Sequence, residues 1–311
     1  GPGQGRRPPP PPRPLCRLEG SRRAGSLPAE AVAAYRRDGF HFPYRLMPRE
    51  RALQTGEDFL AFTRSDVARR YPDPQNQLYL LKAHLIFTWA DAIVHDPGLL
   101  DAVESLIGPD ILVWSSGVFW KAPHSGAYVS WHQDSTNFEL DDASGVVRAW
   151  VALTPATLEN GTMRFAPGLH GTGQVRHVDR KAEGELLSRG ETIDLAIDEA
   201  RTVPVLIDAG EVSFHHLHTP HGSGPNASDR PRVNHAITFV APHVRPLRGQ
   251  DSAQLARGQD RFGHYALEPR PRADLDPAAL AAHESAMALR NAIIYRGAPL
   301  PRAPRHAEVW S

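Results

Sequence analysis

Apolar positions recur at helical spacing in the first third of the chain. Apolar residues three to four positions apart predict helices from about residue 26 to Gly39, over 49–63, in the second half of 78–94 and over 97–107. Ser26 is a candidate N-cap of the first helix, and Pro28 fits its first turn. Gly39 is expected to end that helix, as glycine does at many helix C-termini. The first third of the chain is therefore predicted to be mostly helical.

After residue 110 the pattern changes to short β-branched and aromatic runs between turns. Strands are expected at 111–120, 129–133, 146–154, 162–165, 203–206, 212–214 and 235–240. Turn signals such as Asn160-Gly161 separate them. Residues 179–199 form a polar insertion, interpreted as an active-site flap, and one more helix is expected at 277–290. Many short strands favour an antiparallel barrel or jelly roll, so the predicted fold class is mainly β with flanking helices.

Composition restricts the setting in which this domain works. Thirty-five basic and 35 acidic residues cancel, so no net field favours nucleic acid or an anionic membrane. The single cysteine, Cys16, rules out an intrachain disulfide and agrees with a reducing, cytoplasmic location. No apolar run approaches the roughly 18 residues that span a bilayer.

The chain divides by composition into three parts. Residues 1–24 are rich in proline and arginine and are predicted to be a disordered leader, with a polyproline ligand for a partner protein as the alternative. Residues 25–300 are predicted to form a single domain whose β core covers about 110–245, and 301–311 to form a tail. The oligomeric state stays open.

A His-x-Asp motif carries the first sign of chemistry. His132 and Asp134 are two residues apart, so a strand would direct both side chains to one face, as two ligands of a metal. The motif alone is weak evidence because short motifs recur by chance. With a second imidazole from His221, it would complete the two-histidine, one-carboxylate set of non-haem Fe(II) oxygenases, which leaves three coordination positions open.

The motifs around these residues resemble those of one enzyme family. The His132-x-Asp134 pair, the run His-Gly-Ser-Gly-Pro-Asn-x-Ser that begins at His221, and Arg232 after it are similar to the phytanoyl-CoA dioxygenase family, over about residues 28–245. The resemblance implies a double-stranded β-helix, a cupin-like jelly roll, that holds Fe(II) and uses 2-oxoglutarate and O2 as cosubstrates. Residues 251–265 look like the bacterial branch that acts in small-molecule and natural-product metabolism.

The resemblance also implies roles for individual residues. His132, Asp134 and His221 would bind the metal and form the catalytic centre. Arg232 would grip the far carboxylate of 2-oxoglutarate, because a guanidinium binds a carboxylate through two parallel hydrogen bonds. Three further residues match family positions at the cosubstrate, although a capped turn, core packing and a surface lysine are their respective structural alternatives: Ser223, Trp150 and Lys82.

Several assignments stay open at this point. Arg230 is the alternative to Arg232 as the residue that binds the cosubstrate carboxylate. His215 lies six residues before His221 and is the alternative to His221 as the distal metal ligand. The crowding of histidines there suggests either a second metal or, as we favour, hydrogen bonding around the first. That group is His215, His216 and His218. His170, in a segment that resembles the one closing the barrel, is expected to be structural.

Contacts with the primary substrate are expected next to the open metal positions. Four residues just past or just before the His-x-Asp motif are candidates: Asn137, Phe138, Trp120 and Lys121. Three arginines could bind an anionic substrate group or lie on a solvated face: Arg148, Arg164 and Arg176.

The predicted reaction is hydroxylation of an unactivated C–H bond in a small organic metabolite, with release of succinate and CO2. In related halogenases a small residue replaces the carboxylate, so Asp134 disfavours halogenation. Desaturation, cyclisation and epimerisation start from the same hydrogen abstraction and stay open. The alternative from another class is a zinc-dependent hydrolase or a metal-binding module on the same barrel. Arg232 discriminates, because a zinc hydrolase has no use for a buried cation that faces the metal.

Overall fold

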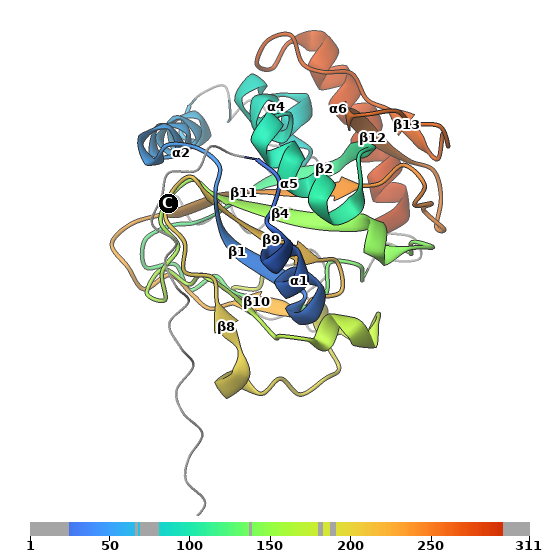
Figure 1. Ribbon diagram of the computed structural model, residues 1–311. Coiled ribbons are helices and arrows are strands. Elements are labelled where there is room, and N and C mark those ends of the chain that lie inside the picture. Colours follow the sequence, from blue (N-terminus) through green and yellow to red (C-terminus); the bar gives the residue numbers. More distant parts are fainter. Residues whose placement is uncertain are drawn as a thin grey trace, which may run out of the picture.

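Two facing β-sheets with helices packed on one side form the protein (Figure 1). The computed structural model describes residues 25–65, 68, 81–136, 139–179, 183–186 and 191–294. The main sheet has seven strands in the order β1-β9-β4-β11-β2-β12-β13, and the smaller sheet has four in the order β3-β10-β5-β8. The predicted fold class, a mainly β jelly roll with flanking helices, is confirmed.

The main sheet is built on a fully buried central strand. All nine residues of β11 (Arg232–Val240) are buried, and it pairs antiparallel with β2 (Ile111–Lys121) and β4 (Val146–Ala152). Its valines, isoleucine and phenylalanine suit a strand covered on both faces. The remaining strands are β1 (Phe40–Arg45), β9 (Glu211–His216), β12 (Asp251–Arg257) and β13 (Tyr265–Leu267).

The smaller sheet consists of short strands that carry much of the chemistry. It contains β3 (Val129–His132), β10 (His221–Ser223), β5 (Met163–Phe165) and β8 (Val203–Pro204). Strand β10 lies between β3 and β5, so that His221 pairs with His132 on one side and with Phe165 on the other. Strands β6 (His177–Asp179) and β7 (Glu191–Ile193) form a separate pair within the predicted flap.

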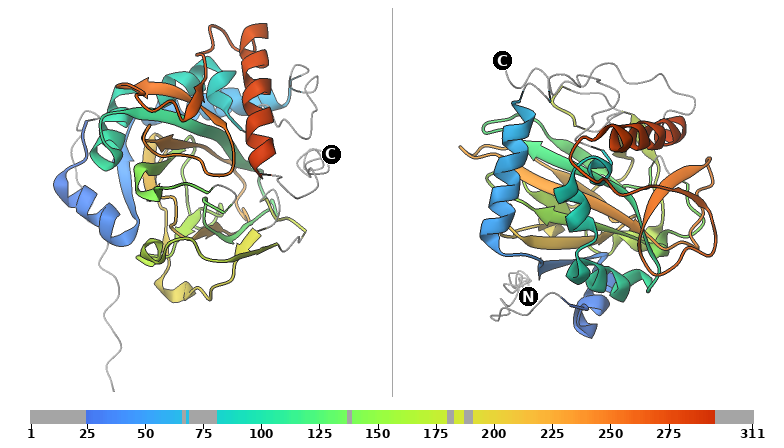
Figure 2. Two further views of the ribbon diagram at one scale, coloured as in Figure 1. Left: turned by 90° about the vertical axis from the view of Figure 1, so that its right-hand side faces the viewer. Right: turned by 90° about the horizontal axis from the view of Figure 1, so that it is seen from above.

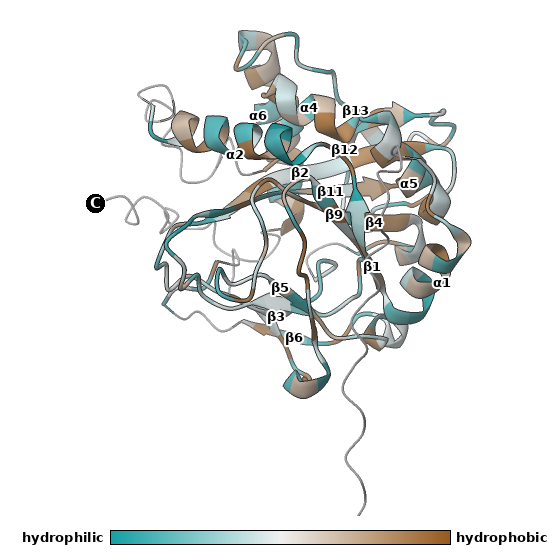
Figure 3. Ribbon diagram, turned by 60° about the vertical axis from the view of Figure 1, so that its left-hand side comes forward, coloured by the Kyte–Doolittle hydropathy of each residue, from teal (hydrophilic) through white to brown (hydrophobic). Residues whose placement is uncertain are grey.

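Helices cover the face of the main sheet that points away from the smaller sheet (Figure 2). They are α1 (Ala29–Asp38), α2 (Arg49–Thr63), α4 (Thr88–Val94), α5 (Pro97–Ile107) and α6 (Pro277–Ile294). Their apolar sides, brown in Figure 3, pack against Val151, Phe214 and Ile237 of the sheet. A second apolar cluster lies between the two sheets and includes Trp150 and Phe165. Each face of the main sheet is therefore buried against a different partner.

Several sequence predictions are confirmed and others are corrected. Helices at 49–63 and 97–107 are present, and Gly39 ends the first helix with a left-handed φ of 87°. Ser26 is not its N-cap, because the helix begins at Ala29 with Pro28 in the N-cap position and no side-chain cap. The strand expected at 129–133 ends at His132.

The β structure extends beyond the predicted core of residues 110–245. Strands β1 and β12 both belong to the main sheet, yet the first falls in the predicted helical part and the second after the end of the predicted β core. The predicted leader and tail lie outside the described residues, and the division into domains stays a prediction.

Candidate metal centre and cosubstrate site

Three predicted ligands converge between the two sheets. His132 ends β3 and His221 begins β10, and because these residues are register partners their rings lie 4.1 Å apart between centroids. Asp134 lies in the turn after β3 rather than on the strand. One donor atom from each residue lies within 4.8 Å of the other two, and the described ranges contain no other such group of histidine, cysteine or acidic residues. The turn, not strand alternation, brings the carboxylate to the imidazoles.

Hydrogen bonds orient both imidazoles for metal binding. His132 Nδ1 donates to the carbonyl of Ser130 and His221 Nδ1 to that of Thr219, each at 2.9 Å. A carbonyl only accepts, so Nδ1 carries the proton and Nε2 keeps its lone pair. The two Nε2 atoms lie 3.6 and 3.7 Å from the carboxylate oxygens of Asp134. The two imidazole lone pairs and the carboxylate are therefore already oriented to bind a metal ion.

The charge states also suit a metal. Burial, together with the neighbouring His132, lowers the pKa of His221 well below its ordinary value, so the ring is neutral. Burial alone would raise the pKa of Asp134, but the guanidinium of Arg148 and the surrounding imidazoles hold it well below its usual range. The neutral imidazole of His221, the imidazole of His132 and an ionised carboxylate are donor types that fit Fe(II) in an open facial site, and they also fit Zn(II).

A buried arginine and a buried lysine lie side by side next to this centre. Arg232 begins β11 and faces Lys121 on β2 across the sheet register. Arg232 is 4% exposed and its Cζ lies 5.6 Å from the centre of the Trp150 ring. One of its terminal nitrogens donates to the carbonyl of Gly161, whereas its buried Nε has no hydrogen-bond partner in the described part of the chain. Burial lowers the pKa of Arg232 to about 10.

Lys121 shares this environment. Its Nζ donates to Ser223 Oγ at 2.9 Å and to the carbonyl of Gly224. Burial, and next the charge of Arg232, lower the pKa of Lys121 to about 6. No carboxylate of the described residues forms an ion pair with Lys121 or Arg232. The Arg232 guanidinium, with its unpaired N–H, and the Lys121 amine beside it form a receptor for a carboxylate that the described residues do not provide.

The comparisons with known proteins agree with this geometry. Residues 24–234 match the phytanoyl-CoA dioxygenase (PhyH) family. The chain belongs to this family. The predicted family, the enzyme class of 2-oxoglutarate-dependent non-haem iron dioxygenases, and the cofactors Fe(II) and 2-oxoglutarate are thereby confirmed.

Two relatives in sequence are named as dioxygenases, and the name of one includes alpha-ketoglutarate. A probable alpha-ketoglutarate-dependent hypophosphite dioxygenase of Stutzerimonas stutzeri is 33% identical over 172 residues, which are 53% of this chain and 58% of that protein. The ectoine dioxygenase of Bordetella parapertussis is 26% identical over 229 residues, or 68% of this chain and 74% of its own length. The chain thus spans somewhat more than half of the first relative and about three quarters of the second.

Solved structures extend the likeness to most of the fold. The non-heme monooxygenase ThoJ in its apo form is 41% identical, with a TM-score of 0.74 over 86% of this chain and 98% of that one. CytC3 with Fe(II) and alpha-ketoglutarate is 21% identical, with a TM-score of 0.59 over 80% and 95%, and shows the shared fold alone. Among the helices that the structure describes, none has the length and apolarity needed to cross a bilayer.

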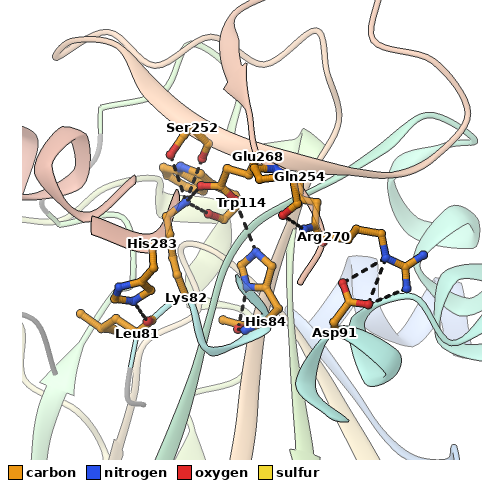
Figure 4. A network of polar contacts seen from close by, with 12 residues as sticks. Leu81, Lys82, His84, Asp91, Trp114, Ser252, Gln254, Glu268, Arg270 and His283 are labelled. Atoms are coloured by element: carbon orange, nitrogen blue, oxygen red, sulfur yellow. Dashed lines mark hydrogen bonds and ion pairs between the residues drawn. The ribbon is translucent and has the colours of Figure 1, made fainter. Parts of the chain in front are cut away.

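Lys82 does not lie at the cosubstrate site, which corrects its predicted role. Its Nζ is 2.5 Å from the carboxylate of Glu268 and 2.9 Å from the carbonyls of Trp114 and Ser252 (Figure 4). Its backbone N–H donates to the carbonyl of Ser116. The register partner of Ser116 is Ile237, which belongs to the core under the helices. The side chain therefore lies on the opposite face of the main sheet, and Lys121 is the lysine beside Arg232.

The substrate candidates have mixed outcomes. Trp120 packs against the core under the helices, because adjacent strand residues point to opposite faces and Lys121 faces the site. Asn137 and Phe138 lie outside the described residues. Arg164 donates to Thr202.

Burial and neighbouring side chains decide between the remaining arginine and histidine candidates. Arg176 is exposed beside Asp194, and Arg230 is exposed whereas Arg232 is buried. The rings of His216 and His218 meet edge to face, and the ring of His216 lies tilted against that of His170, without forming a second group of metal donors in the described chain.

Two residues near Asp134 were not assigned to it from the sequence. Arg148 and His215 both contact its carboxylate. The sequence named Arg148 as a candidate for an anionic group and His215 as a candidate for hydrogen bonding around the metal. Their register pairing on β4 and β9, which brings both to Asp134, is visible only in the structure.

Proposed function

We propose that this chain hydroxylates a small organic metabolite at an unactivated C–H bond, with release of succinate and CO2. The observation that carries the proposal is the buried Arg232–Lys121 pair, unpaired by any described carboxylate, beside three converging metal donors. Nε2 of His132, Nε2 of His221 and the carboxylate of Asp134 would hold Fe(II). Bound there, Fe(II) supplies the activation of O2 that the attack on a C–H bond requires.

Arg232 and Lys121 position the cosubstrate. Arg232 binds its far carboxylate through the free Nε and a terminal nitrogen, and Lys121 on β2 with Ser223 on β10 binds the same group. Ser223 lies two residues after His221 on β10, about 7 Å along a strand. A five-carbon dicarboxylate bridges that separation between the metal and the cations. Lys121, predicted as a substrate contact, therefore takes a role toward the cosubstrate.

Apolar side chains keep water away from the reacting atoms. Trp150, Met163 and Phe165 are buried between the sheets next to the ligands. A dry site strengthens the ion pairs of the cosubstrate, because charges interact more strongly where water is excluded.

The finer predictions stay proposals and draw support from composition. Equal numbers of acidic and basic residues, 35 each, favour a small-molecule partner over nucleic acid or a membrane surface, and the single cysteine favours the cytoplasm. A natural-product substrate is supported only by the resemblance of residues 251–265 to the bacterial branch of the family. Desaturation, cyclisation or epimerisation would use the same residues.

An anaerobic titration tests the proposal without knowledge of the substrate. Fe(II) and 2-oxoglutarate are added to metal-free protein, and the visible metal-to-ligand charge-transfer band is recorded for the wild type, Arg232→Met and His132→Ala. A band in the wild type that both variants weaken supports the proposal. Metabolites are then screened for succinate release. Fe(II) binding without any band, or turnover that needs neither O2 nor 2-oxoglutarate, would favour a zinc hydrolase instead.

A further inference from the structure

The two oxygens of the Asp134 carboxylate have different surroundings. Oδ2 lies 3.0 Å from Nε of Arg148 and 3.2 Å from Nε2 of His215. Oδ1 lies 3.6 Å from Nε2 of His132, and the ring of His221 approaches Oδ2 only to 3.7 Å, beyond hydrogen-bond distance. One oxygen is thus held by an ion pair and a hydrogen bond from the main sheet, whereas the other faces the imidazole ligand.

The main sheet fixes both of these groups in place. Arg148 on β4 is the register partner of His215 on β9 and of Thr238 on β11, so the three side chains form a row that faces the smaller sheet. Thr238 accepts a hydrogen bond from Nη1 of Arg148 at 2.6 Å. The side chains of His215 and Arg148 are 2% and 17% exposed. Neither is a mobile surface group.

The proton on His215 must lie on the nitrogen that faces Asp134. An ionised carboxylate only accepts, so Nε2 is the donor. The other nitrogen, Nδ1, is buried and has no hydrogen-bond partner among the described residues. A histidine in this tautomer has no lone pair toward the centre, so His215 is a donor to a ligand and not a ligand itself.

We propose that Arg148 and His215 are positioning residues that hold Oδ2 of Asp134 and leave Oδ1 as the single oxygen for the metal. The proposal rests on the function proposed above for the three ligands. Its consequence concerns coordination positions. Two imidazoles and one carboxylate oxygen would hold a metal with three positions open for the cosubstrate and O2. A carboxylate that binds through both oxygens would occupy one of those three.

Matched substitutions at His215 separate donation from packing. His215→Gln places an amide nitrogen near the position of Nε2, whereas His215→Asn is one methylene shorter and does not reach Oδ2. Arg148→Lys keeps a charge and Arg148→Met removes it. His216→Leu is the control, because His216 lies on the same strand with its partner Val147 in the core on the other face.

Two readouts that need no turnover test the proposal. Anaerobic Fe(II) affinity is measured by competition with a chelator, and the charge-transfer band is recorded with 2-oxoglutarate. We expect His215→Asn and Arg148→Met to bind Fe(II) about 10- to 100-fold more weakly, the size of effect usual for residues that orient metal ligands, and to lose band intensity. His215→Gln and His216→Leu should stay near the wild type. His215→Asn should still bind one metal ion, whereas His221→Ala should bind none.

The outcomes distinguish this proposal from the one it rests on. Equal Fe(II) affinity and equal bands in His215→Gln, His215→Asn and Arg148→Met would overturn the positioning role and leave the proposed function intact. A wild type that binds no Fe(II) would overturn both. Loss of metal in His215→Asn with metal retained in His221→Ala would make His215 the ligand and refute the proposal. If metal-free Arg148→Met unfolds, the comparison of His215→Gln with His215→Asn decides.

Discussion

Binding of 2-oxoglutarate should weaken as pH rises, because Lys121 is uncharged in the free site. Burial and Arg232 lower the pKa of Lys121 to about 6, so only about 1% of free sites carry its ammonium at about pH 8. A bound carboxylate against Nζ favours the charged lysine, so that binding takes up close to one proton above the lowered pKa. Each further pH unit then weakens the apparent affinity by up to about tenfold, or about 1.4 kcal/mol.

Isothermal titration calorimetry measures this coupling directly. Anaerobic titrations of the Fe(II)-loaded protein in two buffers with different ionisation enthalpies give the number of protons taken up, since the carboxylates of 2-oxoglutarate do not titrate near neutral pH. Lys121→Met should bind more weakly near pH 6 and show almost no pH slope. Lys121→Arg stays charged, so its affinity should also be flat but higher at alkaline pH.

The wild type should move from the affinity of the charged variant toward that of the uncharged one as pH rises. The reasoning is refuted if the wild type takes up no proton at about pH 8, where its free lysine is uncharged. It is equally refuted if Lys121→Met keeps the slope of the wild type, because another group would then be titrating.

Three other substitutions give separate tests. Arg232→Met should raise the Kd for 2-oxoglutarate about 10- to 100-fold in the same calorimetric titration, since charge-assisted hydrogen bonds are lost. Glu268→Gln leaves Lys82 buried without its counter-charge and should lower the free energy of unfolding in urea by about 3–5 kcal/mol, with cosubstrate binding unchanged. The pKa of Glu268 is lowered to about 2, mainly by Lys82 acting against burial, so this stabilisation is present above its ordinary value of 4.5 and is lost as pH falls through about 2. Gly161→Ala places a Cβ against the carbonyl of Gly224 at a φ of 67°, so thermal melting should occur at a lower temperature and cosubstrate affinity should fall, because the Gly161 carbonyl accepts from Arg232.

The metal ligands could be predicted because their residue types and the motifs around them are those of a known metal site. His132, Asp134 and His221 are convergent in the structure as the sequence implies. Which of Lys82 and Lys121 lies beside Arg232 could not be predicted from residue type and motif. Both are fully buried lysines near β2, and only the direction of each side chain relative to the sheet decides which one meets Arg232.

Strands β1 and β12 are among the strands that the sequence did not predict, each for a physical reason. Strand β1 contains Pro43, which lacks an N–H, and this is tolerated because β1 lies at the edge of the sheet. Strand β12 begins with four buried residues of which three are polar. Asp251 accepts from the indole of Trp114 at 2.7 Å and Ser252 accepts from Lys82, so partners far away in sequence make a polar strand suitable for burial. The hydropathy pattern along the chain does not reveal these hydrogen-bond partners.

The ion pair between Lys82 and Glu268 bears on how far a folded piece of this chain has to extend. The family match ends at residue 234, inside β11, before the strand β12 that pairs with β2. A fragment cut there would leave Lys82 without its counter-charge and one side of β2 without hydrogen-bond partners. We therefore expect that a folded catalytic region extends at least through Glu268, and that a fragment cut at the limit of family similarity aggregates.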